Sequence, residues 1–283
     1  MANESTTAVL SELLPSIVAE AMFQAQEQSI MRGLVKNYTM GANNGKTITV
    51  PIWDTVAAAA VAEGTDLTNT ALNTESAVLT VGEVGVMATV TDLAVRTSAS
   101  NVVADAGRLM GEAIAKKIDQ DLMGQFDNFT TTALGGADVT ITAAKIFEAV
   151  AKLRSQGVSG ADIFCVLHPE VAYDLKANMT NTFANANAND LANEALRTGY
   201  VGTIAGVNIF ETANMENTGT AGDYKGGVFH RDALGLAMMQ DINIETQRDA
   251  SLRATELVAT AVYGQGVLLN KYGVEMHFDS SIV

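Results

Sequence analysis

The sequence has 283 residues, a formal net charge of −15 and one cysteine. This length allows one large domain or two small ones, with a core that needs no disulfide. The acidic balance excludes a dedicated nucleic-acid-binding protein, which requires clustered Lys and Arg. The apolar runs are far shorter than the about 20 residues of a membrane span, and the N-terminus lacks the segments of a secretory signal. We therefore expect a protein made in the cytoplasm that binds no membrane.

Charged residues make up 17% of the chain, against roughly 25% in an average soluble domain. Two interpretations remain open. The chain is either an alanine-rich monomer or a subunit that buries much of its surface against copies of itself. We favour the second, because the cores of protein interfaces are depleted in charge.

Residues 5–31 carry apolar side chains at helical spacing and predict an amphipathic helix, with Pro15 at a kink or at the true helix start. This helix either packs on the core of its own subunit or reaches across to a neighbour.

Residues 46–53 and 77–91 alternate between apolar and polar side chains, as strands do. The polar, small-residue segment 55–76 lies between them, and loops of this length are usually functional or disordered. We therefore predict a long protruding hairpin. No basic residue occurs between Lys46 and Arg96, whereas this interval contains six acidic residues: Asp54, Glu63, Asp66, Glu75, Glu83 and Asp92.

A long helix is predicted from Thr97 or Ser98, either of which could be the N-cap, through Phe126. Its apolar positions place Leu109 at the centre of a buried stripe. The spacing assigns the other faces to polar residues: Asp105, Arg108, Glu112, Lys116, Asp119 and Gln120.

Residues 135–240 alternate between predicted helices and strands. Thr142 caps a helix that Gly157 closes, residues 162–167 form a buried strand, and Pro169 opens a short helix through Leu175. An Asn- and Ala-rich loop covers residues 180–193, and residues 199–211 form a tight turn that leads into a strand. Four further strands are predicted at 226–230, 242–246, 256–263 and 272–278.

Catalytic and ligand-binding motifs are missing from the sequence. The three histidines are far apart in the chain, and the lone Cys165 lies in a predicted core strand, so we expect no metal site and no cofactor. Gly264-Gln-Gly266 follows a strand, but Leu269 breaks the dinucleotide-binding pattern. His168 lies at a strand end and is the best candidate for an enzyme, although we interpret it as structural.

The order of these elements resembles the tailed-phage major capsid proteins of the Hong Kong 97 type. Shorter motifs are similar as well: Val61-Ala-Glu63-Gly64 in the hairpin, Phe164-Cys-Val-Leu-His-Pro169, and the segment from Gly202 to Phe210 with its Gly206 turn. The resemblance implies an α+β fold with an N-terminal arm (1–36), an extended hairpin loop (45–92) and an α/β axial domain (135–240). A peripheral domain comprises 37–44, 93–134 and 241–283, including a spine helix at 98–129.

This resemblance implies a major capsid protein without enzymatic activity that assembles with itself into an icosahedral shell around double-stranded DNA. The implied partners are a separate scaffolding protein, a portal and a decoration or cement protein. Assembly contacts are expected at six residues: Trp53, Glu63, Asp66, Leu109, Gly202 and Gly206. Two alternatives are an encapsulin-like cellular compartment of the same fold and an unrecognised α/β enzyme using His168.

One departure from the family's founding member concerns covalent links between subunits. In that member, a lysine of the extended loop forms an isopeptide bond with a neighbouring asparagine. No lysine occurs here between Lys46 and Lys116. We therefore expect a shell without such links.

Overall fold

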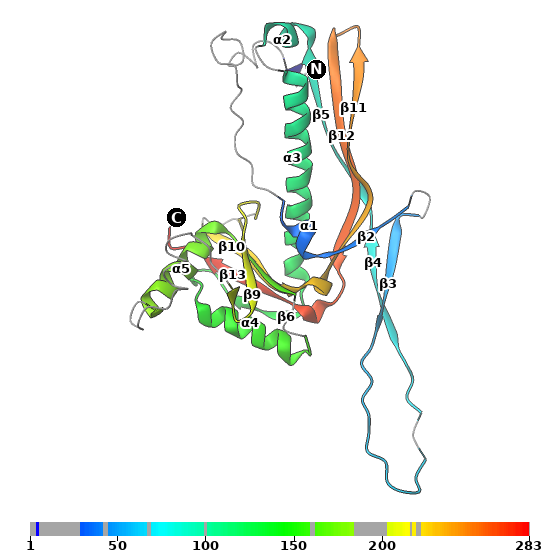
Figure 1. Ribbon diagram of the computed structural model, residues 1–283, viewed down its shortest axis with the longest axis vertical. Coiled ribbons are helices and arrows are strands. Elements are labelled where there is room, and N and C mark those ends of the chain that lie inside the picture. The colour runs from blue at the N-terminus through cyan, green and yellow to red at the C-terminus, as the bar shows by residue number, and fades with distance from the viewer. Residues whose placement is uncertain are drawn as a thin grey trace.

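The computed structural model describes residues 4–5, 29–41, 45–66, 69–98, 101–158, 162–183, 203–215, 217–218 and 222–282. These residues form an elongated body in which a long helix lies beside a five-stranded sheet. A lobe built on a six-stranded sheet adjoins one end of the helix, and a two-stranded hairpin projects from the body (Figure 1). The predicted α+β class is confirmed.

The five-stranded sheet is dominated by two long antiparallel strands, β11 (Leu234–Asp249) and β12 (Ala254–Val267). Its strand order is β1 (Glu4–Ser5), β5 (Gly82–Thr91), β12, β11 and β2 (Lys36–Thr39). The sequence predicts much shorter versions of β11 and β12. Most residues in the outer half of β11 are exposed on both faces, so the alternation that marks a half-buried strand is lost there.

The long helix α3 (Val102–Met123) packs its apolar face against this sheet and continues as a 3₁₀ helix, η2 (Gly124–Asn128). Its N-cap is Asn101, whose side chain accepts a hydrogen bond from the backbone N–H of Ala104. The predicted caps Thr97 and Ser98 are therefore wrong. Both belong to the end of a separate helix, α2 (Asp92–Thr97), where Ser98 is the extended C-cap residue.

The predicted phase of α3 is wrong at two positions. Leu109 is 38% exposed, whereas Met110, Ile114, Ile118 and Leu122 lie on the buried face. Asp119, predicted on a polar face, is fully buried. It precedes Leu122 by three residues and Met123 by four, and these spacings place it on the same side of the helix as these two buried side chains.

The lobe contains the second hydrophobic core, formed by the six-stranded sheet and two helices, α4 (Ala143–Ser155) and α5 (Pro169–Phe183). The sheet order is β6 (Thr131–Gly135), β13 (Gly273–Asp279), β10 (Asp223–His230), β7 (Ile163–Leu167), β9 (Val207–Glu211) and β8 (Thr203–Ile204). The buried strand at β7 and the helix after Thr142 are confirmed. Helix α5 is longer than predicted and extends into the segment expected to be a loop.

Two domain boundaries expected from the sequence do not follow the sheets. Residues 273–279 were expected in the peripheral domain, yet β13 pairs with β10 and β6 in the lobe. Conversely, residues 234–240 were expected in the axial domain, yet they begin β11 of the five-stranded sheet. The chain thus enters the five-stranded sheet earlier than expected, at Leu234, and returns to the lobe for β13.

The projecting hairpin pairs β3 (Thr47–Trp53) with β4 (Thr74–Thr80) in antiparallel register. This pairing ends at Thr80, before the predicted hairpin does, because residues 82–91 form β5 of the five-stranded sheet.

The remaining helices are short. Helix α1 (Met31–Leu34) packs against α3. Two 3₁₀ helices, η3 (Arg231–Ala233) and η4 (Asn270–Tyr272), directly precede β11 and β13. The predicted helix at 5–31 lies mostly outside the described residues; Glu4–Ser5 form the short strand β1.

The corrected phase of α3 gives a direct test. We expect Ile114→Asp to prevent folding, because the side chain is 2% exposed and an unpaired buried charge costs several kcal/mol. Leu109→Asp is the matched control on the exposed side of the same helix and should leave a soluble subunit. Soluble yield and thermal unfolding of the two variants measure the difference; equal behaviour would contradict the helix phase described above.

Candidate functional site

The hairpin exposes large apolar side chains that its own subunit does not cover. Trp53 and Leu72 are each 67% exposed, and three valines around them are about half exposed: Val56, Val61 and Val78. Beyond the β3–β4 ladder, the loop is closed by backbone hydrogen bonds from Asp54 N to Asn73 O and from Thr65 N to Ala62 O. A segment with this composition and no core requires another surface to bury its apolar side chains.

The charge of the hairpin is of a single sign. Glu63 and Asp66, both predicted assembly residues, are exposed near the loop tip, and Asp54 and Glu75 are exposed where the strands end. The sequence places no basic residue in this interval. A surface that receives the hairpin must therefore tolerate or neutralise carboxylates as well as cover a tryptophan.

The base of the hairpin has a small core of its own. Leu79 and Val81 are buried with Met40, Ala237 and Leu268, and side chains from both hairpin strands pack around them. Val81 N donates a hydrogen bond to Lys46 O at 2.9 Å, which ties the two ends of the hairpin together. The base is therefore fixed to the body, while the distal loop is not.

The root of the N-terminal segment is held by one buried carboxylate. Asp119 Oδ1 accepts hydrogen bonds from Ser29 Oγ at 2.7 Å and from Met31 N at 3.2 Å, and Oδ2 accepts one from Ile30 N at 2.9 Å. A longer contact of 3.5 Å joins Asn214 Nδ2 to Oδ2. Asp119 thus connects the start of α1 with α3 and with the loop after β9.

The far end of the five-stranded sheet carries a bidentate ion pair. Arg248 Nη1 and Nη2 lie 2.6 and 2.7 Å from the two carboxylate oxygens of Asp92, which joins β11 to the first residue of α2. These hydrogen bonds, together with the charges of Arg248, Arg96 and Arg253, hold the pKa of Asp92 below its usual value. Since both partners are exposed, this pair orients the tip of the body more than it stabilises the fold.

His168, the best sequence candidate for catalysis, is a packed structural residue. Its ring stacks on Tyr224 with centroids 3.6 Å apart, and its Nδ1 accepts a hydrogen bond from Glu170 N at 3.4 Å. Burial lowers the pKa of His168 and favours the neutral imidazole. Cys165 is fully buried, and burial raises the pKa of its thiol to about 12, so it is chemically inert at neutral pH.

The remaining predicted assembly residues are scattered. Gly206 lies in the β8–β9 turn with a φ of 81°, next to Ala205 at 55°, so this glycine serves a left-handed backbone position. Leu109 lies on the exposed side of α3, away from the hairpin, and Gly202 lies outside the described residues. The structure therefore brings Trp53, Glu63 and Asp66 together on one hairpin and places Leu109 and Gly206 on other elements. Sequence reasoning missed Asp119, although it lies three and four residues before Leu122 and Met123 and so on the same side of the helix as these buried residues.

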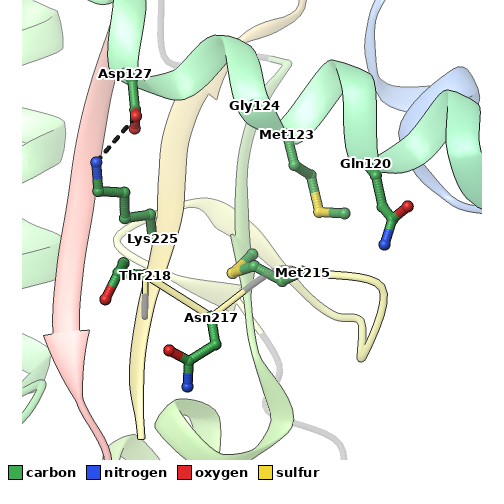
Figure 2. Close-up of a pocket in the computed structure, with 8 residues that line it drawn as sticks. All are labelled: Gln120, Met123, Gly124, Asp127, Met215, Asn217, Thr218 and Lys225. Atoms are coloured by element: carbon green, nitrogen blue, oxygen red, sulfur yellow. Dashed lines mark hydrogen bonds and ion pairs between the residues drawn. The ribbon is translucent and has the colours of Figure 1, made fainter. Parts of the chain in front are cut away.

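Figure 2 shows a cavity of about 320 Å³ where the end of α3 and η2 meet the lobe. Gln120 and Met123 approach it from the helix, while Met215 and Asn217 approach it from the lobe. The ammonium group of Lys225 that lines this cavity is already paired with Asp127 at 2.9 Å and lies 3.6 Å from Glu275. The cavity therefore offers no uncompensated charge to a ligand.

Two further classes of feature are absent from the described residues. These residues contain no group of three or more His, Cys, Asp or Glu side chains placed to hold a metal ion. None of the described helices has both the length and the apolar character of a membrane span.

The fold is shared with solved phage capsids. The capsid of Helicobacter pylori bacteriophage KHP30 superimposes with a TM-score of 0.75 at 11% identity, covering 99% of each chain. The capsid of Cyanophage P-SCSP1u gives a TM-score of 0.73 at 18% identity, covering 96% of this chain and 95% of that one. The fold is therefore that of the Hong Kong 97 type capsid proteins.

Sequence comparison assigns the family. A family model described as phage capsid protein matches residues 74–274. The major capsid protein of Staphylococcus phage phiMR11 is 25% identical over 269 residues, which cover 92% of this chain and 91% of that protein. The chain belongs to the phage capsid protein family and is a major capsid protein, a subunit of the icosahedral head shell and a component of the virion. This confirms the interpretation of the chain as a viral capsid protein.

The buried carboxylate of Asp119 gives a prediction for the arm root. We expect Asp119→Ala to lower the free energy of unfolding by about 3 kcal/mol, because three donors lose their acceptor in a buried place. Cleavage by a protease near residues 29–31 should also become faster. Asp127→Ala is the matched control, since it removes an exposed partner of Lys225 and should cost about 1 kcal/mol or less. Equal unfolding and cleavage in the two variants would contradict the role of Asp119.

Proposed function

We propose that this major capsid protein forms its shell through non-covalent contacts in which the hairpin of each subunit lies across a neighbouring copy. The single observation that supports this proposal is the hairpin itself, with Trp53 and Leu72 mostly exposed on a segment without a core. Burying each side chain against a neighbour contributes about 2 kcal/mol. Because each contact is repeated around a closed shell, modest contacts per subunit sum to a stable particle.

Within this proposal, Trp53 is the apolar anchor of the hairpin, and Glu63 and Asp66 select the surface that it contacts. Carboxylates at the loop tip disfavour acidic surfaces, and the whole subunit carries a net charge of −15. The hairpin therefore has few places on a second copy where it can lie without repulsion. This restriction would favour one register of neighbouring subunits over others.

The remaining parts of the proposal concern the partners and place of assembly. The shell assembles in the host cytoplasm, with a separate scaffolding protein and a portal, and encloses double-stranded DNA without reading its sequence. The net charge of −15 supports the last point, since an acidic wall repels phosphate and leaves the genome free to enter and leave. The subunit has a structural rather than an enzymatic role, in keeping with the inert environments of His168 and Cys165.

Shortening the hairpin tests its role in assembly. Replacing residues 55–72 by Asn-Gly joins Asp54 to Asn73, which are already hydrogen-bonded, through a two-residue turn and keeps the β3–β4 ladder. We expect a folded, soluble subunit that forms no closed shells in electron micrographs. As a control, replacing Ala59 by Ser keeps the loop length and should assemble normally. Normal shells from the shortened variant would refute the proposal.

The absence of covalent links can be checked on mature particles. No lysine occurs between Lys46 and Lys116, so the loop has no amine nucleophile for an isopeptide bond. Lys46 lies at the hairpin base, far from the tip. Particles boiled in detergent with reducing agent should give one band near 29.7 kDa on a denaturing gel. A ladder of larger bands would contradict this prediction.

A further inference from the structure

The second strand of the hairpin continues directly into the five-stranded sheet. Strand β4 ends at Thr80 and β5 begins at Gly82, with only Val81 between them. The last pair that β5 forms with β12 is Gly82 with Tyr263. Beyond this pair the chain leaves the edge of β12 and pairs with β3 alone. In Figure 1 the hairpin departs from the body at this place.

At this departure point the hairpin backbone lies on the face of β12. A Cβ atom built on Gly264 would lie 2.3 Å from Thr80 O, 2.6 Å from Thr80 C and 3.0 Å from the Cα of Val81. All three are backbone atoms, so no side-chain rotation can make room. Any residue larger than glycine at 264 must therefore displace the hairpin strand.

The neighbouring glycine of β12 makes a milder contact. A Cβ on Gly266 would lie 2.8 Å from the Cδ2 of Leu79, which is the end of a side chain that can turn. Gly82, the residue next to the crossing on β5, has open space where its Cβ would lie. The steric requirement for glycine is thus strict at 264, partial at 266 and absent at 82.

This close crossing determines how the hairpin is held at its base. Leu79 and Val81, on either side of Thr80, are buried at 0% and 4% exposure. Their side chains anchor the strand while its backbone rests on Gly264. The described residues of the distal loop are exposed, so the position of the loop follows from the direction in which the strand leaves this crossing.

We propose that Gly264 is a positioning residue for shell assembly, which sets the direction of the hairpin by letting the Thr80–Val81 backbone lie directly on β12. This inference rests on the proposed function of the hairpin as an intersubunit arm. In the sequence alone, Gly264-Gln-Gly266 is an incomplete dinucleotide-binding pattern. In the structure, these glycines leave room for the hairpin strand where it crosses β12.

The expected displacement follows from the length of the hairpin. A methyl group at 264 must move Thr80 O outward by about 1 Å to reach ordinary van der Waals contact. The crossing lies about 7 Å, or two strand residues, from the last β5–β12 pair, so this shift tilts the strand by about 8°. Seven paired residues extend the hairpin by about 23 Å, and the end of the ladder therefore moves by about 3 Å, with a larger shift at the loop tip.

A distance measurement on unassembled subunits tests this directly. Ala59→Cys in the loop and Ala113→Cys on the exposed side of α3 provide two sites for spin labels. Because the thiol of Cys165 is buried, a thiol-reactive spin label should attach at these two introduced cysteines and not at Cys165. We expect Gly264→Ala to shift the mean distance between the labels by about 3 Å or more. Gly82→Ala, the matched control, should leave it unchanged.

The same variants without labels are then assembled and imaged. We expect Gly264→Ala to abolish closed shells or to change their size, and Gly82→Ala to give normal ones. An unchanged label distance in Gly264→Ala would overturn the inference and leave the proposed function of the hairpin intact. A shifted distance with normal shells would overturn the link between hairpin direction and assembly. The shortened hairpin described above tests the proposed function separately.

A second variant covers the case in which Gly264→Ala does not fold. Gly266→Ala should fold, because the side chain of Leu79 can turn away, and should produce a smaller shift in the same direction with fewer closed shells. If Gly264→Ala is insoluble, an unchanged distance and normal shells in Gly266→Ala would overturn the inference.

Discussion

The contact between the apolar face of α3 and the five-stranded sheet is the interaction on which the rest of this subunit depends. Ile114, Ile118 and Leu122 pack from the helix against side chains of β5, β11 and β12. Both the hairpin and the N-terminal segment are attached to the subunit at the helix and the sheet that form this contact. The N-terminal segment is tied to α3 through Asp119, and the hairpin leaves the sheet where it crosses β12.

Aromatic side chains at the end of α3 attach the lobe to the helix and its five-stranded sheet. Phe126 packs against Phe129 and Phe229 with ring centroids 6.0 and 5.4 Å apart. Gly227 of β10 leaves room for the Phe126 ring, which lies 3.0 Å from where a Cβ would be. Because this junction is closely packed, the helix, the sheet and the lobe form one continuous body, and the hairpin projects from it.

Sequence reasoning predicted those features that depend on local pattern. The alternation in residues 47–53, the helix after Thr142 and the buried strand around Cys165 follow from side-chain periodicity, and the structure has them. The resemblance to capsid proteins supplied the order of the parts and the function. Among the site residues, exposure of Trp53, Glu63 and Asp66 on the hairpin could be predicted, because a segment without a core leaves its side chains uncovered.

The features that sequence reasoning missed depend on contacts between distant segments. The burial of Asp119 depends on donors from residues 29–31, nearly ninety positions away in the chain. The role of Gly264 depends on the path of Thr80, and the placement of β13 in the lobe depends on its pairing with β10. No local pattern encodes these partners. A polar residue on a helix and a glycine pair after a strand are both common, and neither by itself indicates a contact with a distant segment.

The claim that the hairpin is an intersubunit arm is tested most directly by a cryo-electron microscopy reconstruction of the assembled particle. The reconstruction should show the loop between Asp54 and Asn73 lying on a neighbouring subunit, with Trp53 covered there instead of 67% exposed as in the single subunit. A loop that folds back on its own subunit, or one that extends into solvent with Trp53 still uncovered, would contradict the claim.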